Sequence, residues 1–146
     1  MNKYLYIIII LCLLLISAAG CASKETVEPK SVDVDLTALS STMVYAEVSN
    51  IVGNANDYIG KTIKMHGRYY ASFFEKTELY YHFVIIEDAT ACCAQGLEFI
   101  WSGDHIYPDD YPDDNTNIEV TGVFGSYDEL GKTYYYVATD DIIVLK

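Results

Sequence analysis

Two adjacent cysteines, Cys92 and Cys93, are the residues of this sequence best suited to chemistry. A disulfide between neighbours is disfavoured, because a trans peptide holds their Cα atoms about 3.8 Å apart whereas disulfides usually span roughly 4.4 to 6.8 Å. We therefore expect two thiols, or a strained bridge that is easily reduced. Thiolates bind soft metal ions, so one candidate function is a Zn or Cu site.

Three interpretations of the cysteine pair remain open. In the first, the half-buried thiols only fill space in the core. In the second, they bind Zn²⁺ or Cu⁺ together with a carboxylate or an imidazole, although no CxxC or HxxxH spacing favours this. The candidates for that additional ligand are Glu87, Asp88, Glu98, His66, His82 and His105. In the third, the pair serves redox exchange or dimer formation.

A second group of residues combines positive charge with aromatic rings. Strict alternation after Gly60 places one set of polar side chains on a single strand face, and one carboxylate joins them from a later strand. The predicted ligand-binding residues are Lys64, His66, Arg68, Tyr70 and Glu98. Such a face suits a sugar ring or an anionic cell-wall polymer. The alternative is an ordinary polar outer face of a sheet.

Other chemical motifs are weak or absent. The acidic loop Asp104–Asn115 offers oxygen ligands for Ca²⁺ but lacks the glycine of an EF-hand, so we expect a solvated loop. The chain contains no GxSxG, HExxH, phosphate-binding glycine loop or Rossmann fingerprint. The sequence therefore predicts a protein that is not an enzyme.

Composition limits the partners. The 146 residues correspond to about one domain, and 9 Lys and Arg against 21 Asp and Glu give a net charge of −12. Such a surface repels polyanions, so we expect no nucleic acid partner.

The N-terminal segment has the layout of a secretory signal. Lys3 precedes the apolar run Tyr4–Ile16, and small residues lead to Cys21. Ala18-Ala19-Gly20-Cys21 is similar to a bacterial lipobox. We expect residues 1–20 to be a lipoprotein signal peptide and Cys21 to carry the lipid, palmitate or a similar acyl group. The alternatives are an uncleaved anchor or an ordinary secreted protein.

These features predict an extracytoplasmic protein, attached to the bacterial cell membrane through its lipid. Residues 21–41 are polar and without a sustained period, which predicts a flexible tether after the lipidated cysteine. Alternation over Val32–Leu36 leaves open an added edge strand.

Apolar periodicity predicts the folded part. One stripe of a helix spans Thr42–Asn56, and everything after Gly60 has the pattern of strands. The expected strands are Lys61–Phe73, Leu79–Glu87, Gly96–Trp101, Ile118–Phe124, Thr133–Val137 and Ile142–Leu145. Gly67 in mid-strand indicates a bulge or a sharp coil. This pattern predicts a mainly β domain over residues 42–146, a small barrel or sandwich.

Three segments carry a resemblance. Tyr58–Gly67, with its Gly-Lys turn, looks like the opening of an OB-fold domain, and Asn117–Phe124 is similar to the fourth strand of that fold. Asp88–Phe99, with its Cys-Cys-x-Gln-Gly run, resembles a segment of uncharacterised bacterial OB-fold lipoproteins and permease-associated membrane proteins. The resemblance covers about residues 43–146 and brings no established activity.

The resemblance implies a five- to six-stranded OB-like Greek-key barrel with one N-terminal helix, which would plug the open end. The loop Ser102–Thr116 stands where many OB-folds have a helix. The expected function is a lipid-anchored binding module for an envelope protein or polysaccharide. The alternative is a Zn- or Cu-binding lipoprotein that uses Cys92 and Cys93.

Overall fold

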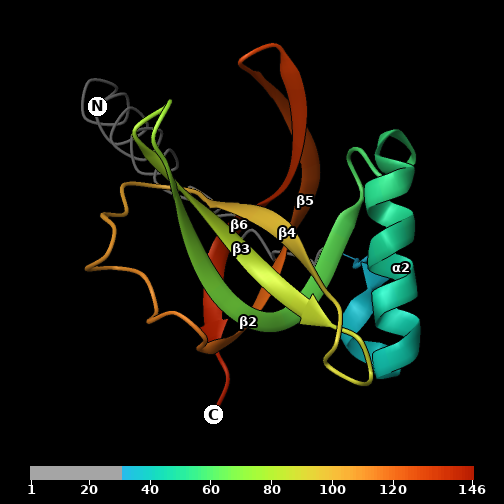
Figure 1. Cartoon of the computed structure of the whole chain (residues 1–146). Helices are drawn as coiled ribbons and strands as arrows, with labels where there is room; N and C mark the ends of the chain where they lie inside the picture. Colours follow the sequence, from blue (N-terminus) through green and yellow to red (C-terminus); the bar gives the residue numbers. More distant parts are fainter. Residues whose placement is uncertain (1–30) are drawn as a thin grey trace, which may run out of the picture.

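Strand β2 (Thr62–Phe74) closes the barrel because it bends and pairs with two different strands (Figure 1). Its first half is antiparallel to β5 (Asn117–Glu129), and its second half is antiparallel to β3 (Leu79–Glu87). Gly67 lies at this change of partner, where a Cβ atom would collide with the carbonyl oxygen of Ile85. The computed structural model describes residues 31–146.

The remaining strands complete a Greek-key barrel. Strand β4 (Ala94–Trp101) is antiparallel to β3 and parallel to β6 (Lys132–Val144), which is antiparallel to β5. The closed order β2-β3-β4-β6-β5 is a five-stranded OB-type barrel, which confirms the predicted fold class. The two last predicted strands are one continuous strand, β6, and the β5–β6 register shifts between Val120 and Gly122.

The segment before the helix belongs to the fold. Strand β1 (Val34–Asp35) pairs in parallel with the start of β2, and the Thr62 backbone N–H donates to the Asp33 carboxylate at 2.7 Å. Leu36, in the 3-10 helix η2 (Leu36–Ala38), is 1% exposed and lies in the core. The prediction of a flexible tether is therefore wrong for Val34–Ala38, which form β1 and η2. Burying the apolar side chain of Leu36 in the core stabilises this ordered arrangement.

Residues 1–30, with the predicted signal peptide and lipidated Cys21, lie outside the described residues. Over residues 31–146, no helix has both the length and the hydrophobicity needed to span a membrane.

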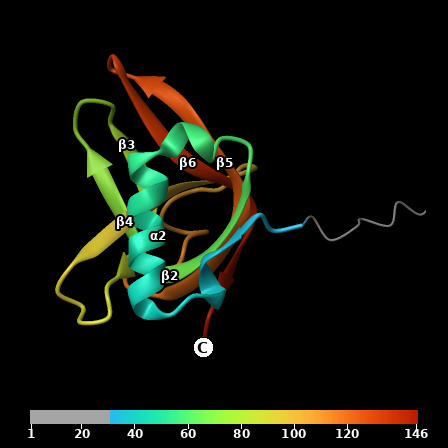
Figure 2. The same cartoon turned by 90° about the vertical axis from the view of Figure 1, so that its right-hand side faces the viewer.

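Helix α2 (Ser41–Gly53) covers one side of the barrel (Figure 2). The Ser40 hydroxyl caps its first turn by accepting from the Met43 N–H, at 3.4 Å. Val48 and Ile51 are fully buried in the barrel core, as the apolar stripe predicts, whereas Val52 of the same stripe is 53% exposed. The 3-10 helix η3 (Ala55–Asp57) follows and leads through the Gly60 turn into β2.

The loop 102–116 is anchored by an aromatic cluster in the barrel. Tyr111 stacks on His82 with ring centroids 4.0 Å apart, and the Tyr69 hydroxyl lies 2.7 Å from Nδ1 of His82. Burial lowers the pKa of His82 to about 4, so this imidazole is neutral at physiological pH. Asp114 also holds the loop by accepting from the Ala71 N–H at 3.1 Å.

Candidate functional site

The predicted ligand-binding face is divided in two by the curvature of β2. Ile63, Met65 and Tyr69 point into the core, so the predicted alternation of β2 is confirmed. Tyr70 and Glu98 belong to the outer face of the β2–β3–β4 sheet.

The basic residues of that face lie on the half of β2 that pairs with β5. Lys64 forms an ion pair with Glu119 at 3.2 Å, and Arg68 forms one with Glu87. His66 is exposed and lines a hollow near the start of α2, together with Arg68. Because Lys64 and Arg68 are each paired with a carboxylate, the positive charge predicted for this face is largely neutralised. A binding role for Lys64, His66, Arg68 and Tyr70 stays a prediction.

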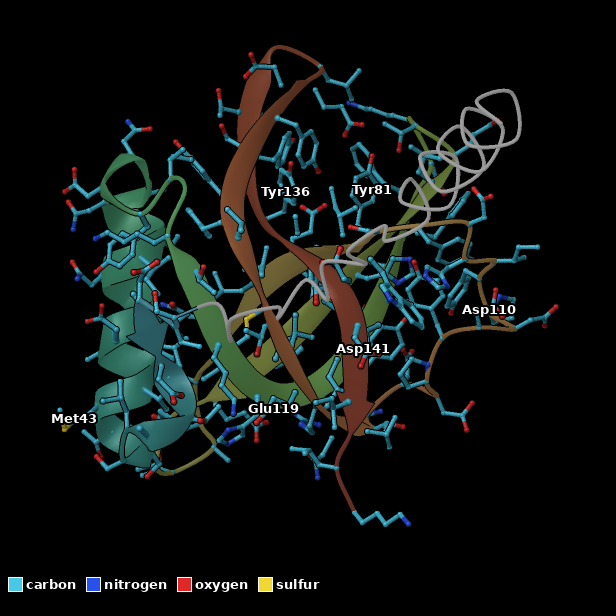
Figure 3. All side chains as sticks on the ribbon, turned by 180° about the vertical axis from the view of Figure 1, so that it is seen from behind. Met43, Tyr81, Asp110, Glu119, Tyr136 and Asp141 are labelled. Atoms are coloured by element: carbon cyan, nitrogen blue, oxygen red, sulfur yellow. The ribbon has the colours of Figure 1, made fainter. Side chains whose placement is uncertain are left out.

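The β2–β3 hairpin and the β5–β6 hairpin both extend beyond the barrel (Figure 1). Between them lies a hollow of about 280 Å³, which we call the hairpin cleft. Its lining residues are Ser72, Phe74, Tyr81, Phe83, Glu98, Tyr127, Glu129 and Tyr134. Tyr81 of β3 and Tyr136 of β6 lie on facing sides of this gap (Figure 3). The cleft is large enough for a side chain or a single sugar.

Glu98 lies at the floor of the hairpin cleft and is 8% exposed. The hydroxyl of Tyr127 lies 3.0 and 3.1 Å from its two carboxylate oxygens and donates to them. Burial raises the pKa of Glu98 to about 7, the negative charge of Glu129 adds to this, and the Tyr127 hydrogen bond opposes it. The expectation that Glu98 is exposed is wrong, because the β5–β6 hairpin covers it.

A second tyrosine–carboxylate pair crosses the cleft. The Tyr81 hydroxyl lies 2.8 and 2.7 Å from the Glu129 oxygens and 2.9 Å from the Thr77 hydroxyl. It therefore links the two hairpins, since Thr77 belongs to the β2–β3 turn and Glu129 to β5. Tyr127 stacks on Tyr134 with centroids 5.6 Å apart, which stiffens the β5 side.

The chemistry of the cleft suits a cation. Its lining combines two carboxylates with aromatic faces and, among residues 31–146, includes neither Lys nor Arg. Positive groups are attracted both by carboxylates and by the faces of aromatic rings. Sequence reasoning missed Tyr127, Glu129 and Tyr134. The sequence signal that could have indicated these residues is the concentration of tyrosines on both sides of the turn 128–131.

The cysteine pair lies in the β3–β4 loop, where both thiols are free and exposed. Their exposure rules out the interpretation that they fill the core. The two sulfurs are 3.6 Å apart. Of the six candidates for an additional metal ligand, Asp88 is the one that lies beside them. Other candidate ligands lie elsewhere in the fold. His82 is in the aromatic cluster, and the ring of His105 stacks on that of Trp101 with centroids 3.6 Å apart.

Comparison with known proteins yields little. No protein-family model matches the chain, and no curated protein matches it either. One solved structure is similar, the dimeric N-terminal domain of PriB protein from Thermoanaerobacter tencongensis. It is 16% identical, with a TM-score of 0.40, over 58% of this chain and 96% of that domain. The OB-type fold follows from the strand order and pairing of the barrel itself.

Proposed function

We propose that this protein is a lipid-anchored, extracytoplasmic binding module whose hairpin cleft takes a positively charged group of an envelope protein or polysaccharide. The observation that carries the proposal is Glu98, a buried carboxylate that faces a second carboxylate between aromatic walls. OB-folds commonly bind ligands on this sheet face and between the loops that flank it.

A cation in the cleft would relieve the cost of burying Glu98. An ionised carboxylate accepts several hydrogen bonds, and Tyr127 supplies one donor to Glu98. An ammonium or guanidinium group would add charge-assisted donors and favour the ionised form. Cation binding is thus linked to proton release, and the net charge of −12 favours the approach of a positive ligand.

The anchor and location rest on the sequence. The lipobox-like Ala18-Ala19-Gly20-Cys21 supports lipidation of Cys21, and the apolar run before it supports export. Mass spectrometry of the protein purified from bacterial membranes tests this. We expect a chain that begins at an acylated Cys21, and an unprocessed N-terminus would contradict it.

Calorimetry with paired small ligands tests the cleft. Nα-acetyl-lysine N-methylamide carries the ammonium group, and its Nε-acetylated form has the same shape without the charge. At pH 8 we expect the charged ligand to bind more tightly by about tenfold, a difference of about 1.4 kcal/mol typical of a good charged contact. Glu98→Gln should reduce that preference, because the carboxylate of Glu129 remains in the cleft lining.

Lys64→Gln is the matched control, because Lys64 lies on the other half of β2 and pairs with Glu119. It should leave the preference for the charged ligand unchanged. Equal binding of the two ligands would refute a cation site, and a preference that Glu98→Gln leaves unchanged would refute the role of Glu98 in it. The same titration with glucosamine and N-acetylglucosamine distinguishes an envelope polysaccharide from a protein.

A further inference from the structure

We propose that Asp88, Cys92 and Cys93 form a Zn²⁺ site in the β3–β4 loop, separate from the hairpin cleft. The Cys92 sulfur lies 3.6 Å from the Cys93 sulfur and 3.3 Å from Oδ2 of Asp88. One ligand atom from each residue fits in a group no wider than 4.8 Å. Both thiols are exposed, so an ion reaches them directly from solvent.

These separations match the edges of a zinc tetrahedron. With Zn–S bonds of about 2.3 Å and Zn–O bonds of about 2.0 to 2.2 Å, tetrahedral angles place two sulfurs about 3.8 Å apart and a sulfur and an oxygen about 3.6 Å apart. Two of the three edges, at 3.6 and 3.3 Å, lie within about 0.3 Å of these values. The third edge, between the Cys93 sulfur and an Asp88 oxygen, is no longer than 4.8 Å, and rotation of the exposed Cys93 side chain would shorten it. The three side chains would thus supply one face of the tetrahedron, and the fourth position would face solvent.

Hydrogen bonds within the loop hold this arrangement. Oδ1 of Asp88 accepts from the backbone N–H groups of Thr90 at 3.1 Å and Cys92 at 3.0 Å. This leaves Oδ2 directed at the Cys92 thiol. The Asp88 N–H donates to the Cys93 carbonyl at 2.9 Å, and Ala91 adopts a left-handed turn with φ of 53°. The ligands are therefore partly preorganised, which reduces the entropy lost on binding.

The donor set favours zinc over copper. Cu⁺ prefers soft sulfur ligands over carboxylates, whereas Zn²⁺ accepts thiolate and carboxylate together. Binding replaces the S–H bonds of Cys92 and Cys93 by two Zn–S bonds, and the two protons pass to the buffer. The Asp88 carboxylate, already ionised, adds a Zn–O bond.

The test uses the full chain in detergent micelles with a non-thiol reductant, in a Cys12→Ser, Cys21→Ser background. In that background the thiols are those of Cys92 and Cys93. Zn²⁺ is titrated against a chromophoric chelator, and Co²⁺ replaces it for absorption spectra. We expect one Zn²⁺ per chain, together with the sulfur-to-cobalt and tetrahedral d–d bands of a two-thiolate site.

Each ligand substitution then has a defined outcome. Cys92→Ser and Cys93→Ser should each weaken binding by at least about tenfold and lower the intensity of the cobalt–thiolate bands, because one thiolate remains. Asp88→Asn should weaken binding while keeping those bands. Asp104→Asn, in an exposed loop on another part of the barrel, is the control and should change neither, with circular dichroism confirming that every variant is folded. No saturable binding, or one Zn²⁺ that survives both Cys→Ser changes, would overturn the proposal.

Discussion

Replacing Glu98 by Gln should stabilise the protein at pH 8 and leave its stability nearly unchanged at pH 4. Gln has almost the same shape and keeps an oxygen that accepts from Tyr127. It removes the charge that burial in the cleft disfavours. Since the pKa of Glu98 is raised from 4.5 to about 7, the folded protein holds a proton that the unfolded chain releases.

The sign and size follow from that linkage. Below pH 4.5 Glu98 is protonated in both states, so the substitution removes no charge. As the pH rises from 4.5 to 7, the free energy of unfolding of the natural protein falls, because the unfolded chain loses this proton over that range while the folded protein keeps it. At about 1.4 kcal/mol per pKa unit the full effect is about 3 kcal/mol, and solvent at the mouth of the cleft reduces it to about 1.5 to 3 kcal/mol.

Urea unfolding of the full chain in detergent micelles, at pH 4, 6 and 8, measures this. Trp101 is the one tryptophan, and it packs on His105, so its fluorescence reports unfolding. Glu75→Gln, which removes an exposed carboxylate from the β2–β3 turn, controls for the change in net charge. If Glu98→Gln destabilises the protein at pH 8, or if its effect is the same at all three pH values, the reasoning fails.

Three further predictions concern the fold and its partners. Leu36→Ala should lower the free energy of unfolding by about 2 to 4 kcal/mol, since Leu36 is fully buried. A change below about 0.5 kcal/mol in urea unfolding would show that β1 and η2 do not unfold together with the barrel. Gly67→Ala should lower the free energy of unfolding by about 1 to 3 kcal/mol in the same assay, because the added Cβ meets the Ile85 carbonyl. Gly53→Ala is the control, and it should be neutral or stabilising because open space surrounds that position. Fluorescein-labelled oligo-dT should show no saturable anisotropy change at about 0.15 M salt, and tight binding there would contradict the argument from net charge.

Local patterns predicted most of the barrel. The alternation in β2, the apolar stripe of α2 and the position of Gly67 each depend on residues close together in sequence, and each is found in the structure. The alternation over Val32–Leu36 left an edge strand open, and the structure has that strand as β1, directly before Leu36. Its burial depends on a parallel pairing with the start of β2, which no local pattern shows.

The candidate site was harder to predict because non-local packing forms it. Alternation correctly placed Glu98 on the outer face of β4, but its burial comes from Tyr127 of the β5–β6 hairpin, 29 residues further along the chain. Likewise, six side chains were candidates to join the cysteine pair. Asp88 is near it because the loop folds back on itself through a left-handed Ala91, which the sequence does not reveal.

The most direct measurement is a two-dimensional amide NMR titration of the protein in micelles with Nα-acetyl-lysine N-methylamide at pH 8. We expect the shifted signals to cluster on residues that line the hairpin cleft, namely Tyr81, Glu98, Tyr127 and Glu129. Signals that shift instead around Lys64, His66 and Arg68, or that do not shift at all, would contradict a cation-binding cleft.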